Sequence, residues 1–175
     1  MLIKYTGHAC FKIRDNETGY SIVFDPYEPD SVPGFGKVVD IASRVICSHE
    51  HFDHNSRDSV QIVPSDTDPF DVKSIDTWHD PEKGALRGPN SITVVTDRKT
   101  GEKVIHYGDI GEKIDDLLTE ENLALLKDAD VALIPVGGTY TYDADEALEL
   151  IRRTNSFAVL RLGKRRISPF GVASN

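Results

Sequence analysis

The 175-residue chain has only two cysteines, one methionine and one tryptophan. Two cysteines cannot build the dense disulfide framework of a small secreted domain, and Cys10 and Cys47 both lie in apolar, strand-like runs. We therefore expect buried free thiols and a cytoplasmic location. The N-terminus lacks a signal-peptide layout, and no apolar run approaches the length of a membrane span, so we expect no membrane partner.

Acidic residues outnumber basic residues by 29 to 20, which gives a formal net charge of −9. A domain of this charge is not expected to bind nucleic acid or an anionic membrane surface non-specifically. With 39% hydrophobic residues, the chain can bury one substantial core, so we expect a single domain over residues 1–175.

The C-terminal stretch lacks two residue types. No acidic residue follows Glu149 and no histidine follows His106, although the stretch carries six basic residues: Arg152, Arg153, Arg161, Lys164, Arg165 and Arg166. We interpret residues 156–175 as an atypical basic tail that arose from a shifted reading frame, natural or a sequencing error. In protein from the native source, an intact mass that matches all 175 residues would rule out the sequencing error. A tail that binds an anion or nucleic acid is the alternative.

One segment is instead dense in metal-ligating residue types, the run Ser48-His49-Glu50-His51-Phe52-Asp53-His54. It holds half of the six histidines and follows the apolar run 41–47, which we predict to be a buried strand. Neutral imidazole and carboxylate are ligands for zinc, manganese and iron. Loops that leave strands are where α/β folds usually place their chemistry. A polar turn with surface histidines is the alternative.

The spacing within this run indicates two metal ions. His49 and His51 are two residues apart, so in extended backbone both side chains point to one side. Asp53 and His54 are adjacent, which favours binding to a second ion nearby. Paired ions roughly 3.5–4 Å apart can activate a water for hydrolysis.

Strands dominate the first half of the chain, and helices alternate with strands in the second half. This order predicts an α/β sandwich rather than a barrel. Thr119 and the pair Asp143 and Glu146 are typical helix-capping residues. We predict strands over residues 2–5, 9–13, 20–24, 38–47, 71–78, 91–97, 103–107, 131–136 and 156–162, and helices over 113–118, 121–126 and 144–153.

Four further residues with metal-binding or acid–base side chains lie at predicted strand exits. They are His8, Asp25, His79 and Asp109. Each alone is more often a turn or capping residue, but four of them beside a histidine cluster favour a shared site. His106 lies inside a predicted strand, and we interpret it as a packed histidine.

The segment His49 to His54 matches the HxHxDH signature, and the chain resembles the metallo-β-lactamase superfamily. The resemblance continues in order through the segments Tyr5-Thr6-Gly7-His8-Ala9-Cys10-Phe11, Phe24-Asp25-Pro26, His79-Asp80, Arg87-Gly88-Pro89-Asn90, Tyr107-Gly108-Asp109 and Ile134-Pro135-Val136-Gly137-Gly138. These segments are most similar to the branch of ascorbate-phosphate lactonase-type hydrolases. The resemblance implies an α/β fold, the four-layer αββα sandwich, here with an altered or shortened C-terminal end.

The resemblance also implies a role for each matching residue. The first ion would be bound by three histidines, the second by an aspartate and a histidine, and one aspartate would bridge the two ions. A further aspartate would orient a ligand histidine. The first ion would take His49, His51 and His79. The second would take Asp53 and His54, and Asp109 would be the bridge. Asp25 would be the aspartate that orients a ligand histidine. The family takes one more histidine from a loop after its last core strand. The matching segment 156–166 has none, so the second ion could be weakly held, absent, or completed by water or a partner subunit.

We therefore expect a hydrolase that uses one or two divalent ions, with zinc favoured over manganese or iron. A metal-bound hydroxide would attack a small ester, lactone or phosphodiester, which could be phosphorylated. Asp53 or Asp109 would orient the hydroxide, Arg87 would hold an anionic group of the substrate, and His8 would donate a proton or contact the substrate. Arg87 in a surface ion pair and His8 in a structural turn are the alternatives. A degenerate metal-binding protein without turnover is the rival function, and redox use of a di-iron site is disfavoured. The oligomeric state is open, and a homo-oligomer would fit the apolar, basic last segment.

Overall fold

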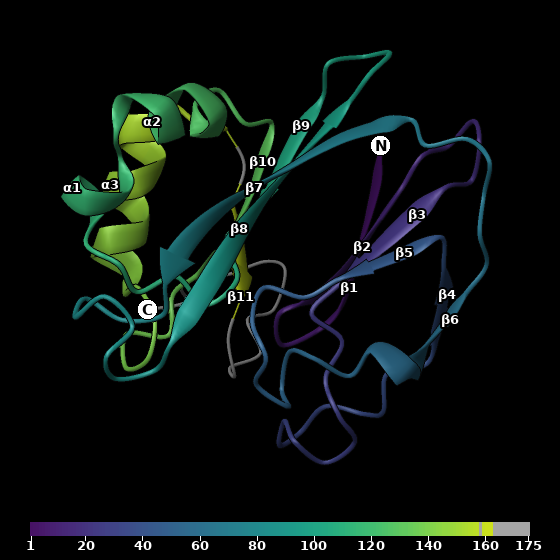
Figure 1. The fold of residues 1–175 in the computed structure, drawn as a ribbon, viewed down its shortest axis with the longest axis horizontal. Helices are drawn as coiled ribbons and strands as arrows, with labels where there is room; N and C mark the ends of the chain where they lie inside the picture. Colours follow the sequence, from purple (N-terminus) through teal and green to yellow (C-terminus); the bar gives the residue numbers. More distant parts are fainter. Residues whose placement is uncertain (158, 163–175) are drawn as a thin grey trace, which may run out of the picture.

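Two β-sheets pack against each other, and the α-helices lie beyond one of them (Figure 1). The structure is a computed structural model that describes residues 1–157 and 159–162. One sheet has the order β1-β2-β3-β5, the other has the order β11-β10-β9-β8-β7, and β4 pairs with β6. The bounds are β1 (Leu2–Gly7), β2 (Cys10–Arg14), β3 (Ser21–Phe24), β4 (Asp40–Ala42), β5 (Arg44–Ile46), β6 (Val60–Ile62), β7 (Phe70–Trp78), β8 (Pro89–Asp97), β9 (Lys103–His106), β10 (Val131–Pro135) and β11 (Val159–Leu162).

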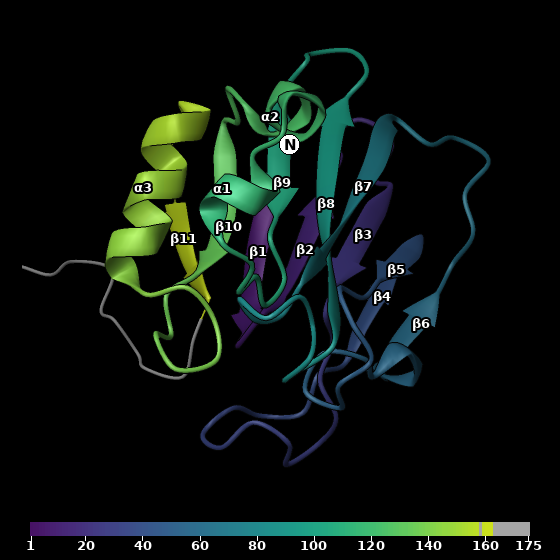
Figure 2. The same ribbon diagram turned by 60° about the vertical axis from the view of Figure 1, so that its left-hand side comes forward.

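The central core lies between the two sheets. Successive strand residues point to opposite faces, so alternate apolar residues of each sheet meet here. Figure 2 shows the strands of both sheets from a second direction. The buried residues of this core are Ala9, Phe11, Ile13, Tyr20, Ile22 and Phe24 from one sheet and its hairpin, and Phe70, Val95, Val104 and Leu133 from the other.

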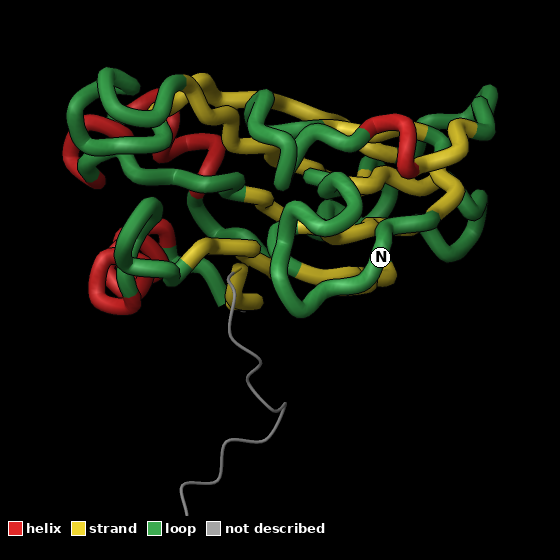
Figure 3. The backbone as a smooth tube through the Cα atoms, turned by 90° about the horizontal axis from the view of Figure 1, so that it is seen from below, coloured by secondary structure: helices red, strands yellow, loops and turns green. Residues whose placement is uncertain are grey.

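Three α-helices cover the outer face of the five-stranded sheet. They are α1 (Ile114–Leu117), α2 (Glu120–Leu126) and α3 (Ala144–Thr154), grouped to one side of the strands in Figure 3. The Thr119 side chain accepts a hydrogen bond from the backbone of Asn122, and Asp143 and Glu146 form a capping box. Both predicted caps are therefore confirmed. Within the described part of the chain, no helix has the length and apolar character needed to cross a membrane.

The outer face of the four-stranded sheet is covered differently. A second core of Cys10, Val23, Tyr27, Val32, Val38, Ala42 and Val60 joins this face to the loop 26–39 and the β4–β6 pair. Among the described residues, the only helix on this side is the one-turn 3₁₀ helix η1 (Arg57–Ser59). The predicted α/β class is confirmed. Cys10 is buried and Cys47 is half-buried, and both are free thiols, so only Cys10 fully matches the prediction.

The prediction of a single buried strand over the run 41–47 is wrong. The run divides at Ser43 into β4, which pairs with β6, and β5, which pairs with β3. Between them, the Ser43 backbone donates a hydrogen bond to the carbonyl of Ser21. Ile41 is 54% exposed because β4 belongs to the outer pair. β6 was not predicted. The predicted strand over 156–162 is confirmed for the residues of β11. Residues 163–175 of the predicted tail lie outside the described residues.

Candidate metal centre

Five strands end where the candidate ligands lie. The histidine run follows β5, His79 follows β7, Asp109 follows β9, Asp25 follows β3, and His8 sits in the turn between β1 and β2. Ligand atoms from both sheets come together there in three overlapping groups, in each of which the atoms lie within 4.8 Å of one another. The groups are His49, His51 and His79, then His8, Asp53 and His54, and then His49, His54 and Asp109.

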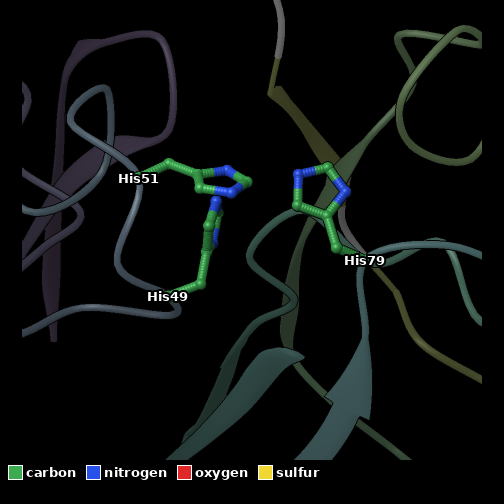
Figure 4. Close-up of side chains that lie close together, drawn as sticks. All are labelled: His49, His51 and His79. Atoms are coloured by element: carbon green, nitrogen blue, oxygen red, sulfur yellow. The ribbon is translucent and has the colours of Figure 1, made fainter. Parts of the chain in front are cut away.

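The first group consists of three imidazoles. His49 and His51 come from one loop and face His79 at the end of β7 (Figure 4). The ring centroids of His49 lie 4.5 Å from His51 and 5.0 Å from His79, and the other pair is 5.4 Å apart. The ligand nitrogens of the three rings lie within 4.8 Å of one another, so they can converge on one ion.

A hydrogen-bond chain fixes the orientation of the His49 ring. Its Nδ1 lies 2.8 Å from the hydroxyl of Ser48, and that hydroxyl donates to Asp25 at 2.6 Å. The hydroxyl therefore accepts a hydrogen bond from Nδ1–H, which leaves a lone pair on Nε2 of the neutral ring. That Nε2 is buried and has no partner among the described residues. Burial, together with the charge of His54, lowers the pKa of His49 to about 3, so the ring is neutral at pH 7, as a metal ligand must be.

Asp25 lies beneath the loop and is completely buried. It accepts hydrogen bonds from the Ser48 backbone at 2.7 Å and from His54 Nδ1 at 2.8 Å. Burial alone would raise the pKa of Asp25, but the charges of His106 and His54 outweigh it and hold that pKa low. Because His54 Nδ1 carries the donated proton, its Nε2 faces the ligand groups. The φ of Asp25 is 42°, a left-handed conformation that aspartate tolerates better than most residues.

The second group joins His8 to the adjacent pair Asp53 and His54. His8 Nε2 lies 3.2 Å from His54 Nε2 and 3.4 Å from Asp53 Oδ2. Burial opposes charge on His54, but the carboxylates of Asp109 and Asp25 outweigh it and raise its pKa well above the usual range. Burial also opposes charge on Asp53, but the hydrogen bond from His8 and the charge of His54 bring its pKa to about 2.

Asp109 connects the two groups. Its Oδ2 lies 3.3 Å from His54 Nε2 and 3.3 Å from His79 Nε2. Burial alone would raise the pKa of Asp109, but the nearby charge of His54 holds it well below the usual range. The Asp109 backbone donates to Asn90 Oδ1 at 2.9 Å. Gly108 allows this close approach, because a Cβ at its φ of 57° would lie 2.3 Å from that oxygen.

Sequence reasoning assigned no role to Ser48 or Asn90, although both hold site residues in place. Ser48 links His49 to Asp25, as described above. Asn90 donates to Thr77 and to the Tyr107 carbonyl while its oxygen holds Asp109. Asn90 lies in a segment that matches the family and Ser48 directly precedes one, which was the available signal, but their hydrogen bonds connect segments distant in sequence.

Two other candidate residues lie outside the three groups. Arg87 is half-buried, donates to the Thr139 carbonyl at 3.4 Å and lies 5.1 Å over the Tyr140 ring. Among the described residues it forms no ion pair. His106 is buried, stacks on Phe24 at 5.1 Å and bonds through Nε2 to the Ala9 carbonyl at 3.0 Å. The interpretation of His106 as a packed residue is therefore confirmed.

Comparison with known proteins identifies the family. The Beta-lactamase superfamily domain matches residues 2–162. A UPF0173 metal-dependent hydrolase from Carboxydothermus hydrogenoformans is 28% identical over 187 residues, which cover 86% of this chain and 79% of that protein. A second UPF0173 metal-dependent hydrolase, from Thermoplasma volcanium, is 24% identical over 185 residues, which cover 88% of this chain and 79% of that protein.

A solved structure agrees with this assignment. It is a Thermotoga maritima protein of the metallo-beta-lactamase superfamily. The two structures superimpose with a TM-score of 0.69 at 28% sequence identity, over 96% of this chain and 77% of the Thermotoga maritima chain. The lactonase-type branch stays a prediction. The chain belongs to the metallo-β-lactamase superfamily.

Proposed function

We propose that this protein is a metal-dependent hydrolase that works with two divalent ions. The observation that supports the proposal most is the position of Asp109 Oδ2, which is 3.3 Å from a histidine nitrogen of each group. One carboxylate oxygen between histidines of two groups is placed so that it could bridge a pair of ions.

The proposed ligands follow the groups. The first ion would be held by three imidazoles, a ligand set found in catalytic zinc enzymes, which favours zinc there. The second would be held by Asp53 and His54, with Asp109 between the two ions. The residues fit metal ions because His49 Nε2 is a buried, unpartnered acceptor and because the donors are imidazole and carboxylate. Manganese and iron accept the same donors.

The chain's own residues would orient the reactants. When bound, the ions would supply Lewis acidity and lower the pKa of a water toward about 7. Asp53 and Asp109 have low pKa values, so both are ionised at neutral pH and accept hydrogen bonds that set the direction of an attacking water. Asp25 would keep His54 Nε2 turned to the site.

The substrate that we propose is a small ester, lactone or phosphodiester. Each presents an acyl or phosphoryl centre that a metal site polarises and a water can attack. Arg87 has no carboxylate partner among the described residues. Its guanidinium is therefore available for a phosphate or carboxylate on the substrate.

The proposal is tested by metal-dependent turnover. Metal-free protein is reloaded with zinc, manganese or ferrous iron and assayed on p-nitrophenyl acetate, bis(p-nitrophenyl) phosphate and a sugar lactone. We expect turnover of at least one class only after metal is added. Asp109→Asn should lower kcat/KM by about 100-fold or more, because even residues that only orient ligands are worth 10–100-fold.

Glu50→Gln is the matched control. Glu50 lies in the same loop, but its side chain is 73% exposed and belongs to none of the three groups. This variant should keep wild-type kcat/KM. Metal binding without turnover on any of the three classes would contradict the proposal and support a degenerate metal-binding protein instead.

A further inference from the structure

His8 lies in a turn that constrains its position. The φ of His8 is 51°, in the left-handed region, and the residue is 7% exposed. The preceding Gly7 has a φ of 152°, and a Cβ there would lie 2.4 Å from the Phe35 ring. A non-glycine residue in this conformation costs free energy that the surrounding structure must offset, and such strain clusters at functional sites.

The ring nitrogen of His8 faces two proposed ligands of the second ion. Its Nε2 is 3.2 Å from His54 Nε2 and 3.4 Å from Asp53 Oδ2, while these two atoms are 3.9 Å apart. Ligand atoms 2.0–2.1 Å from a tetrahedral zinc ion are roughly 3.3–3.4 Å from one another. The two separations that involve His8 therefore match those of atoms that share one ion, and the His54–Asp53 separation of 3.9 Å is somewhat longer.

The contact between two ring nitrogens also needs a positive partner. His54 Nδ1 donates to Asp25, so Nε2 of neutral His54 carries a lone pair. Two lone pairs 3.2 Å apart repel, so either a proton or a cation must lie between His8 and His54. Nδ1 of His8 is buried and has no partner among the described residues, so no contact at Nδ1 fixes the tautomer.

We infer that His8 is a direct ligand of the second metal ion, rather than a proton donor or a substrate contact. The inference rests on the proposed two-ion site and deepens it. The second ion would then be held by two imidazoles and two carboxylates, from His8, His54, Asp53 and Asp109. One ligand comes from the turn between β1 and β2, and the others come from the loops after β5 and β9.

Metal stoichiometry of His8→Asn tests the inference. Asparagine tolerates the left-handed conformation at this position but is too short to replace the imidazole. Wild type should bind two equivalents of zinc, as measured by calorimetric titration and elemental analysis. In His8→Asn, the first equivalent should bind with unchanged affinity, and the affinity for the second should fall by about 100-fold or more. Glu50→Gln should bind two equivalents like the wild type.

A second readout needs no variant. In wild-type protein with ¹⁵N-labelled histidine, zinc should give metal-bound ring-nitrogen shifts to every histidine except His106. If His8 is not a ligand, its ring nitrogens should keep the shifts of the metal-free protein, as those of His106 should. That result, or two equivalents of unchanged affinity in His8→Asn, overturns the inference and leaves the proposed function standing. A wild type that binds one ion or none contradicts the proposed two-ion function itself, and the inference falls with it.

Discussion

Asp25 determines which nitrogen of His54 faces the ligand groups. The carboxylate can only accept at neutral pH, so His54 must carry a proton on Nδ1, and Nε2 is the nitrogen left to bind a metal ion. The same carboxylate accepts from the Ser48 backbone and hydroxyl, and that hydroxyl fixes the tautomer of His49. One buried residue therefore orients a candidate ligand of each ion.

Substitution of Asp25 by asparagine should reverse this arrangement. Asparagine tolerates the same left-handed backbone, but its amide nitrogen donates, so it would favour the His54 tautomer with the proton on Nε2. We expect metal affinity to fall by about 10–100-fold. We also expect the free energy of unfolding to fall by about 1–3 kcal/mol, from loss of hydrogen bonds to a buried charge. Isothermal titration with zinc and urea unfolding of the metal-free protein measure the two effects.

A negative result would be clear for Asp25→Asn. Wild-type zinc affinity in the variant would contradict the orienting role of Asp25. A fall in stability with unchanged zinc affinity would show that Asp25 supports only the fold. Thr67→Ala is the control, because Thr67 is exposed and its side chain and carbonyl contact Ser65 rather than a site residue. This variant should change neither the zinc affinity nor the free energy of unfolding.

At the scale of single residues, the sequence predicts the candidate ligands better than it predicts the residues that orient those ligands through hydrogen bonds. The spacing of His49, His51, Asp53 and His54 indicates two ligand sets, and the structure brings these residues together with His79 and Asp109. The roles of Ser48 and Asn90 depend on hydrogen bonds between segments far apart in sequence, which no local pattern reveals. The same holds for the contact of His8 with His54, 46 residues apart.

At the scale of elements, periodicity predicts most strands and helices but not where one run divides. The run 38–47 is apolar enough for one strand, yet Ser43 separates β4 from β5 because the two belong to different layers. The short strand β6 pairs with β4, and because two of its three residues are exposed, its sequence shows no buried pattern. Such tertiary pairings override local propensity.

The β4 strand is tied to the four-stranded sheet by an ion pair that should depend on pH. Asp40 accepts from Lys12 Nζ at 2.7 Å, and its side chain is 11% exposed. Burial opposes the charge on Asp40, but hydrogen bonds from Lys12 and the Ile41 backbone outweigh it and lower its pKa. A carboxyl whose folded-state pKa is lowered stabilises the protein above its unfolded pKa of about 3.9. That stabilisation is lost as the pH falls through the lower, folded-state value.

Asp40→Asn should therefore lower the free energy of unfolding by about 1 kcal/mol at neutral pH. The difference from wild type should shrink as the pH falls below about 4, where the wild-type carboxyl also becomes neutral. Urea unfolding across this pH range measures the difference. Asp71→Asn is the control, since its side chain is 45% exposed and its ion-pair distances are 3.8 and 3.9 Å. A difference for Asp40→Asn that is constant with pH would contradict the assignment.

At the scale of the whole molecule, the two sheets share the site. The four-stranded sheet supplies His8, Asp25 and the histidine run, and the five-stranded sheet supplies His79 and Asp109. The buried core between the sheets fixes their separation, so that ligand atoms from both lie within 4.8 Å. The order of elements predicts the α/β class, but the convergence of the two sheets comes from the resemblance and the structure rather than from periodicity.

The central claim is that two adjacent ions bind across the sheets. Anomalous diffraction from a crystal grown with zinc tests it most directly. We predict two peaks roughly 3.5–4 Å apart. One should lie among His49, His51 and His79, the other should lie among His8, Asp53 and His54, and Asp109 should lie between them. A single peak, or peaks away from these residues, would contradict the account.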